Sequence, residues 1–170
     1  GDANSFTAIA GAVHSFCGVH TNGKIYCWGN GSNGGAGNGI PQNNYGVVEI
    51  DMSAHAESNS FTRVALGRIN TTCGIHTSGQ LFCWGENTDG QVGDGSTTQR
   101  NTPVKVDMSA HTEDNNFKDV DLGDDFTCGI HNSGKAFCWG KGTASGWLGN
   151  GGTTSTSTPV EIDMSAHGLY

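Results

Sequence analysis

Short runs in which apolar and polar residues alternate occur along the whole chain, and glycine ends most of them. Residues 61–66, Phe-Thr-Arg-Val-Ala-Leu, alternate in this way and are followed by Gly67, which predicts a β-strand with one buried side. No segment repeats its apolar positions every 3.6 residues, so the pattern predicts an all-β chain. Three further strands are expected after the first, at residues 72–76, 80–84 and 102–107.

This pattern of four short strands occurs three times, and the repetition decides how the chain is organised. Each copy closes with the sequence Asp-Met-Ser-Ala-His. We therefore predict three four-stranded units in one structural array, at residues 1–59, 60–115 and 116–170. The positions that all three copies share include Phe6, Phe61 and Phe117; His20, His76 and His131; and Trp28, Trp84 and Trp139.

Each unit also holds two cysteines ten positions apart. A three-residue turn such as Thr77-Ser78-Gly79 lies between them, with a glycine that suits a positive φ. A turn of this length places the two cysteines opposite each other, about 4.5 Å apart at Cα, which a disulfide can bridge. Zinc binding is the rival interpretation, but the short spacing of a zinc knuckle is missing. The predicted pairs are Cys17 with Cys27, Cys73 with Cys83 and Cys128 with Cys138.

Disulfides favour an oxidising compartment, so we expect a secreted, cell-surface or periplasmic protein. The chain carries 8 Lys+Arg against 16 Asp+Glu, a formal net charge of −8, which disfavours binding to nucleic acid and to anionic membranes. No apolar run is long enough to predict insertion into a membrane. The first residues lack a signal-peptide pattern, and we expect any such segment to have been removed already.

The second unit shows most clearly a resemblance to a known family. It reads Cys73-Gly-Ile-His, then Cys83-Trp-Gly, then Asn87-x-x-Gly-Gln-x-Gly-Asp-Gly and finally Pro103-Val-x-Val. This resembles a regulator-of-chromosome-condensation (RCC1-type) repeat and is most similar to its cysteine-bearing extracellular variety. The resemblance covers nearly the whole chain, three times over, and it implies one four-stranded β-propeller blade per unit.

Three such blades make an open arc, because closed propellers hold about 4–8 blades and members of the resembled family usually have seven. An arc exposes a blade face at each end. Since the units are equivalent, we expect the end of one chain to fit the start of another, which closes a ring or builds a filament. A truncated larger propeller and an unusual monomer are the alternatives.

The resemblance implies surface recognition rather than chemistry. The founding member of the family is a nucleotide-exchange factor for a small nuclear GTPase, and relatives inhibit enzymes, sense light or form receptor ectodomains. The acidic charge and the paired cysteines weaken the nuclear interpretation. Motifs for a serine nucleophile, a phosphate-binding loop or a zinc protease do not occur in the sequence. We therefore predict a non-enzymatic structural or binding module without a cofactor.

The closing motif of each unit offers a weak candidate for a metal site, since it carries an acid and a histidine four positions apart. We favour a structural interpretation, in which these residues bond the local backbone at the link between blades. The shared histidines and tryptophans are likewise interpreted as packing residues. The candidate metal ligands are Asp51 and His55, Asp107 and His111, and Asp163 and His167.

Trp147 lies in a glycine-rich loop of the third unit, at the position of Gln91 in the second. An exposed aromatic side chain anchors a partner or stacks on a sugar, whereas a packed Trp147 has no such role. A carbohydrate-binding lectin and a protein-binding inhibitor or receptor fragment are therefore the alternative functions. The expected partner is a second copy of the chain, with glycans or a protein ligand as alternatives. Asn30 and Asn70 begin N-glycosylation sequons.

Overall fold

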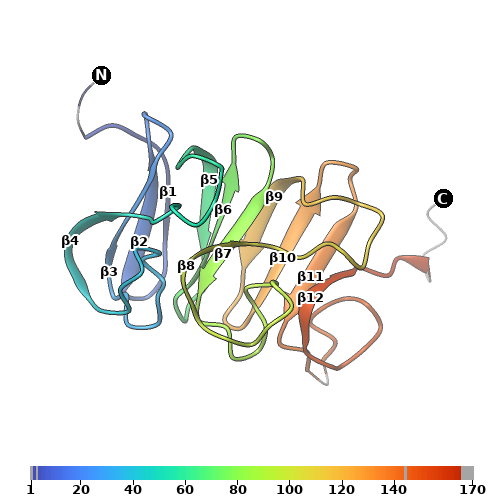
Figure 1. Ribbon diagram of the computed structural model, residues 1–170. Coiled ribbons are helices and arrows are strands. Elements are labelled where there is room, and N and C mark those ends of the chain that lie inside the picture. The colour runs from blue at the N-terminus through green and yellow to red at the C-terminus, as the bar shows by residue number, and fades with distance from the viewer. Residues whose placement is uncertain (1, 3, 144, 166–170) are drawn as a thin grey trace.

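The computed structural model describes residues 2, 4–143 and 145–165. These residues form twelve β-strands and no α-helix, which confirms the predicted all-β fold. The strands make three four-stranded antiparallel sheets, each in chain order, and Figure 1 shows the sheets side by side. We call them blade 1 (β1–β4), blade 2 (β5–β8) and blade 3 (β9–β12). The strands are β1 Phe6–Gly11, β2 Ser15–His20, β3 Ile25–Gly29, β4 Asn44–Glu49, β5 Phe61–Leu66, β6 Thr71–His76, β7 Leu81–Gly85, β8 Arg100–Lys105, β9 Phe117–Leu122, β10 Phe126–His131, β11 Ala136–Gly140 and β12 Thr156–Glu161.

The two middle strands of each blade form a hairpin whose register follows from its turn. In blade 2, Cys73 lies opposite Cys83 and Ile75 lies opposite Leu81. Gly79 in the turn has a φ of 89°, a conformation that glycine adopts without steric cost. The sulfur atoms of the opposed cysteines are bonded in each blade, with Cα atoms 4.1 Å apart. Each hairpin is therefore held covalently within its own sheet.

The outer strand of each blade pairs less regularly. In blade 2, Val104 lies opposite Cys83 and Arg100 lies opposite Gly85, so β8 has extra residues between these two pairs, as in a β-bulge. Pro103 lies in this irregular stretch, where its missing N–H is tolerated. The carbonyl group of Pro103 is then available to a residue outside the sheet.

The hydrophobic cores lie between the blades. One core joins apolar side chains of blades 1 and 2, and the other joins those of blades 2 and 3. Phe61 and Trp84 contribute to the first core, whereas the disulfide of blade 2 and Ile75 contribute to the second. Each blade therefore has an aromatic face toward the preceding blade, which we call its head face. The opposite face carries the disulfide and aliphatic residues, and we call it the tail face.

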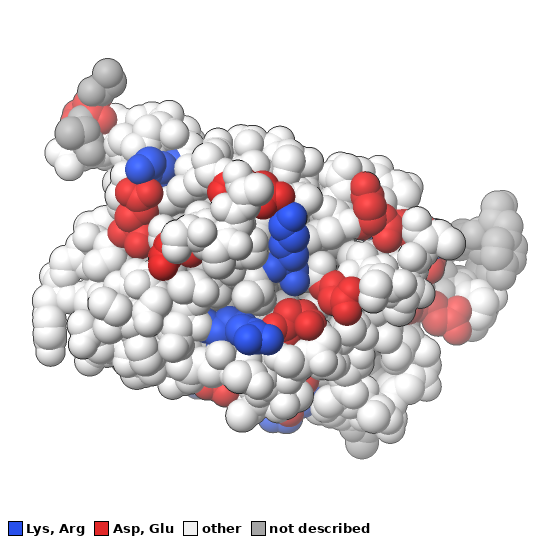
Figure 2. All heavy atoms as spheres, in the orientation of Figure 1, with Lys and Arg blue, Asp and Glu red and all other residues white. Residues whose placement is uncertain are grey.

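Charged side chains do not gather into a single basic patch on the face of the molecule in Figure 2, where Lys and Arg lie beside Asp and Glu. Some ion pairs join neighbouring blades, such as Arg63 with Asp119 at 2.8 Å and Arg68 with Asp124 at 3.2 Å. Exposed pairs of this kind contribute about 0–1 kcal/mol each to stability. The apolar cores therefore contribute most of the free energy that holds the blades together. Within the described part of the chain, no helix has the length and apolarity to cross a membrane.

Candidate functional site

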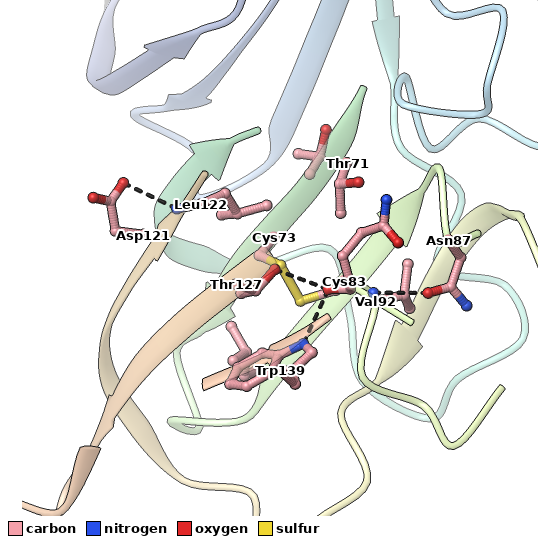
Figure 3. The surroundings of a disulfide bond; sticks show 12 residues. Thr71, Cys73, Cys83, Asn87, Val92, Asp121, Leu122, Thr127 and Trp139 are labelled. Carbon is pink, nitrogen blue, oxygen red and sulfur yellow. Dashed lines mark hydrogen bonds between the residues drawn. A yellow bond between two sulfur atoms is a disulfide. The ribbon is translucent and has the colours of Figure 1, made fainter. Parts of the chain in front are cut away.

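The joint between two blades is built around one backbone carbonyl of the loop between the third and fourth strands. At the joint of blades 1 and 2, the Gly35 carbonyl accepts hydrogen bonds from Thr72 Oγ1 and Trp84 Nε1, both at 3.0 Å. At the joint of blades 2 and 3, the Gln91 carbonyl accepts from Thr127 Oγ1 at 2.8 Å and Trp139 Nε1 at 3.0 Å. Figure 3 shows Thr127 and Trp139 beside the Cys73–Cys83 disulfide. On blades 2 and 3, the buried threonine hydroxyl and tryptophan N–H of the head face are thereby satisfied by the preceding blade.

The links after blade 1 and after blade 2 each add a second contact. His55 Nε2 donates to the carbonyl of Pro103 in blade 2 at 2.8 Å, and its ring lies edge-on to Phe82. His111 repeats both contacts with Pro159 and Phe137 in blade 3. The irregular pairing of β8 and β12 thus supplies the carbonyl that the histidine of the preceding link binds.

The acidic residue of the same motif is used locally. The Ser53 amide donates to Asp51 Oδ1 at 2.9 Å, and hydrogen bonds from the Ser53 hydroxyl and amide lower the pKa of Asp51. Asp107 has the same contact with Ser109, and the Ser109 amide is the main cause of its lowered pKa. In the described residues, no group of three His, Cys, Asp or Glu side chains is placed to hold a metal ion. Asp163 likewise accepts from Ser165, but its partner His167 lies outside the described residues.

The hairpin histidines pack against aromatic side chains and hold the hairpin turn. His76 Nδ1 accepts from the Ser78 amide at 3.0 Å, so its Nε2 is the donor to the Ser58 carbonyl at 3.2 Å. Ser58 belongs to the link that precedes blade 2. His20 in blade 1 accepts from Asn22 in the same way, but its buried Nε2 finds no hydrogen-bond partner in the described part of the chain. The head face of blade 1 therefore lacks a contact that blade 2 has.

The head face of blade 1 is uncovered at apolar positions as well. Phe6 is 41% exposed, although its counterpart Phe61 on blade 2 is only 2% exposed. Trp28 is half-buried and stacks on Phe16, with ring centroids 6.0 Å apart, whereas Trp84 is completely buried. A groove of about 450 Å³ follows this face past Phe6 and His20.

The tail face of blade 3 is uncovered in a corresponding way. Ile130 is 39% exposed, although its counterpart Ile75 on blade 2 is 3% exposed. A groove of about 650 Å³ lies beside Ile162 and Met164, and an apolar one of about 300 Å³ reaches Cys128. Within the described residues, both terminal faces therefore carry exposed apolar side chains.

Trp147, the speculative ligand residue, is exposed at 45%, and its ring is tilted against Phe126 with centroids 5.6 Å apart. Two exposed aromatic residues on blade 1, Phe16 and Tyr45, were not singled out from the sequence. The repeats do distinguish Phe16 from its counterparts, because blades 2 and 3 have Thr72 and Thr127 at the position of Phe16 in blade 1. A comparison of the three units position by position identifies Phe16 as the residue that differs.

The two sequon asparagines have local partners. Asn30 Oδ1 accepts from the amide and the hydroxyl of Ser32. Asn70 is half-buried at the joint of blades 1 and 2, where its Oδ1 accepts from Ser15. Asn87, which is completely buried, organises its loop by donating to the carbonyls of Ser96 and Thr98.

These blades, joined face to face by loop carbonyls and links, define a segment of a β-propeller. Two family models for the regulator of chromosome condensation (RCC1) repeat match the chain, one at residues 78–130 and the other at residues 61–91 and 117–145. The chain belongs to this family, as a member with cysteine-bearing repeats.

Curated relatives and solved structures agree with this assignment. The chain is 30% identical over 159 residues to human E3 ubiquitin-protein ligase HERC2, which covers 92% of the chain and 3% of that protein. It is 30% identical over 152 residues to the mitochondrial RCC1 domain-containing protein RUG3 of Arabidopsis thaliana, covering 88% of the chain and 32% of RUG3. The chain thus spans a third or less of the length of these relatives.

Two solved propellers have the same fold. The crystal structure of human WBSCR16 superposes with a TM-score of 0.83 at 21% identity, over all of this chain and 41% of that one. Yeast RCC1 (Prp20), solved in complex with Kap60, superposes with a TM-score of 0.77 at 18% identity, over 95% of this chain and 37% of that one. The three sheets are therefore blades of an RCC1-like propeller.

Proposed function

We propose that this chain is a non-enzymatic binding module that assembles head to tail with copies of itself. In the assembly, the tail face of blade 3 of one copy covers the head face of blade 1 of the next. The observation that carries the proposal is the exposure of both terminal faces at positions whose counterparts on blade 2 are buried, Phe6 against Phe61 and Ile130 against Ile75. The chain itself contains the complementary face for each, because a blade covers an equivalent face at both internal joints.

Association requires burial of most of the two faces rather than of a single side chain. Complete burial of a large apolar side chain contributes about 1.5–3 kcal/mol, and association costs about 4–15 kcal/mol. One or two side chains are too few. The two faces together offer at least six that are exposed or half-exposed: Phe6, Phe16 and Trp28 on the head face, and Ile130, Ile162 and Met164 on the tail face.

A head-to-tail contact uses two different surfaces, so it either closes into a ring or continues as a filament. Two copies supply six blades, a number within the range of about 4–8 found in closed propellers. The six cysteines are all paired in disulfides, which supports a secreted or cell-surface protein, where such bonds persist. Prp20p was solved together with a description of its binding to Gsp1p and histones, and this supports protein recognition as a use of the fold.

The test is the mass of the protein in solution with its disulfides intact. We expect sedimentation velocity to find a species of at least twice the 17.6 kDa chain mass whose fraction grows with concentration. Ile130→Asp, which places a charge on the tail face, is expected to abolish it. A single 17.6 kDa species at every concentration up to the solubility limit would contradict the proposal.

Ile69→Asp is the matched control. Ile69 is 37% exposed, against 39% for Ile130, but it lies in the turn between β5 and β6 of blade 2. Both variants introduce the same charge at a similarly exposed isoleucine. Association should survive in Ile69→Asp, and its loss there would mean that the effect is one of net charge rather than of the tail face.

Glycan binding is a second candidate, and the exposed indole of Trp147 supports it, since exposed aromatic rings stack on sugars. Binding to a glycan array that Trp147→Ala removes, by a protein that stays monomeric, would favour this candidate over self-association.

A further inference from the structure

Three positions meet at each internal joint, one on the tail side and two on the head side. The tail-side position is the loop residue whose carbonyl is bonded, Gly35 or Gln91. The first head-side position is its threonine donor, Thr72 or Thr127. The second is on the outer strand, where the carbonyls of Asn101 and Ser157 accept from loop amides of the preceding blade, those of Gly39 and Gly95.

The contact at the second head-side position is close. A Cβ atom on Gly34 would lie 2.9 Å from Asn101 Cα, and one on Gly90 would lie 2.6 Å from Ser157 Cα. Because Gly34 and Gly90 directly precede the tail-side residues, the outer strand of one blade lies immediately beside the loop of the preceding one. The three positions therefore form one contiguous contact at both internal joints.

The same three positions carry aromatic residues at the free ends. Trp147 occupies the tail-side position, since the amide of Gly149 bonds the carbonyl of Gly146 just as Gly93 bonds Gly90. Phe16 lies opposite Trp28 as Thr72 lies opposite Trp84. Tyr45 follows the residue paired with Gly29, which is the place of Asn101 in β8.

All three aromatic side chains are exposed, unlike the residues at the internal joints. Tyr45 is fully exposed and Trp147 is 45% exposed, whereas Gln91, the internal counterpart of Trp147, is 1% exposed. Phe16 is 42% exposed and stacks on Trp28 with ring planes 15° apart. The aromatic residues are thus divided between the two faces that the proposed assembly brings together, at positions whose counterparts touch at the internal joints.

We infer that Trp147 of one copy packs among Phe16, Trp28 and Tyr45 of the next, so that an aromatic cluster replaces the threonine hydrogen bond of the internal joints. This inference rests on the proposed head-to-tail assembly and names the residues that specify it. The Trp147 carbonyl accepts the Trp28 Nε1 proton, as the Gly35 and Gln91 carbonyls accept from the tryptophans of blades 2 and 3. Phe16 has no hydroxyl group to donate, and its ring stacks instead.

A second copy fits this cluster better than a glycan does. A glycan site on the loop of blade 3 accounts for Trp147 alone, whereas the complementary positions on blade 1 are aromatic at the same time. At the position where Arg63 pairs with Asp119 across the joint of blades 2 and 3, the terminal joint would place Asp119 beside Ala8, so this position brings no two like charges together. The terminal joint therefore has an aromatic contact where the internal joints have a hydroxyl donor.

The experiment compares three variants by sedimentation velocity: Trp147→Gln and Phe16→Thr, which introduce the residues of the internal joint one at a time, and the double variant. We expect each single variant to weaken association about tenfold or more, as the loss of an aromatic hot spot does. The double variant should associate more strongly than the two single effects predict, because it restores the glutamine and threonine of the joint between blades 2 and 3. Trp147→Phe, which keeps an aromatic ring, should retain most of the affinity.

The outcomes separate this inference from the proposed function. If the parent chain assembles and all variants assemble equally well, the aromatic cluster is wrong and head-to-tail assembly stands. If the parent chain stays monomeric, both fail. All substituted positions are exposed, and an unchanged circular dichroism spectrum with three intact disulfides by mass spectrometry would show that the variants fold.

Discussion

Blades 2 and 3 share a five-residue sequence in the first strand of the hairpin but differ in how much of it is buried. Thr-Cys-Gly-Ile-His ends both β6 and β10. Every residue of β6 is buried, whereas in β10 Cys128 is half-buried and Ile130 is exposed. Among the described residues, blade 2 has a neighbouring blade on both faces, and blade 3 has one on its head face only. Burial in this fold is thus decided by the neighbouring blade rather than by the strand's own residues.

The largest expected effect is a difference in unfolding free energy between alanine variants of two equivalent tryptophans, one at an internal joint and one on a terminal face. Trp84→Ala should lower the free energy of unfolding by about 3–5 kcal/mol, as removal of a completely buried aromatic side chain does, with a further loss of the bond to the Gly35 carbonyl. Trp28→Ala should cost less than half as much, because Trp28 is half-buried. Urea denaturation, at protein concentrations too low for association, measures the loss of unfolding free energy in both variants. Equal losses would mean that another part of the chain covers the head face of blade 1.

The disulfides should show the same contrast with a smaller effect. Replacing either Cys73 and Cys83 or Cys128 and Cys138 by alanine removes a bond across ten residues, which is expected to cost about 2–3 kcal/mol. Access differs between the two, since Cys73 and Cys83 are completely buried and Cys128 is half-buried beside a groove. At protein concentrations too low for association, a mild reductant should therefore reduce the pair of blade 3 first.

Thiol trapping followed by peptide mass spectrometry gives the order of reduction. Blade 1 supplies the control, because its cysteines are 1% and 2% exposed and its tail face is covered by blade 2. Its disulfide should resist as long as that of blade 2. Simultaneous reduction of all three bonds would indicate global unfolding and would refute selective access at the tail face.

The smallest expected effect concerns an ion pair within one blade. Burial acts to raise the pKa of Asp94, but hydrogen bonds from Ser96 and Arg100 outweigh it and lower the pKa. Because the folded-state pKa is below the unfolded value of about 3.9, the carboxylate stabilises the fold above that pH, and the contribution is lost as pH falls through the folded-state pKa. Asp94→Asn should therefore cost about 1 kcal/mol near neutral pH and progressively less in acid.

The control for this prediction is Asp124→Asn, which breaks the ion pair between Asp124 and Arg68. The side chain of Asp124 is 52% exposed and that of Arg68 is 65% exposed. We expect this substitution to change the unfolding midpoint little at any pH, since water screens the pair. Blade 1 has Asn38 and Asn44 in place of Asp94 and Arg100, joined by an amide hydrogen bond at 3.4 Å. A pH-independent loss in Asp94→Asn would show that the charge of Asp94 does not matter to the fold.

Much of the blade was predictable because its determinants are local. Strand 61–66 follows from alternation alone, and its bounds agree with β5. The three-residue turn places Cys73 opposite Cys83, since a hairpin's register depends on the length and backbone conformation of its turn. The interpretation of His55 and His111 as residues of the links agrees with their hydrogen bonds to Pro103 and Pro159, although the sequence pattern did not identify those carbonyls.

The candidate binding faces were harder to predict from the sequence. Trp147 was identified because it is unique to its repeat, but Phe16 and Tyr45 were not, since each is an ordinary strand residue in its own unit. Their exposure depends on which blade lies opposite them, and that is a property of the array. The grooves beside Ile162 and Phe6 likewise exist only because no blade in the described chain covers them.

The sequence by itself determined the repeat, the four strands of each unit and the hairpin register, because these depend on contacts between residues close in the chain or on simple repetition. The expectation of an open arc came from the resemblance of the repeats to propeller blades. Only the tertiary structure decided which face of a blade is aromatic and which carries the disulfide, and which carbonyl accepts each tryptophan. The physical reason is that a strand residue is equally able to face core or solvent until a second sheet packs against it. For the two terminal faces, that second sheet is absent from the described chain.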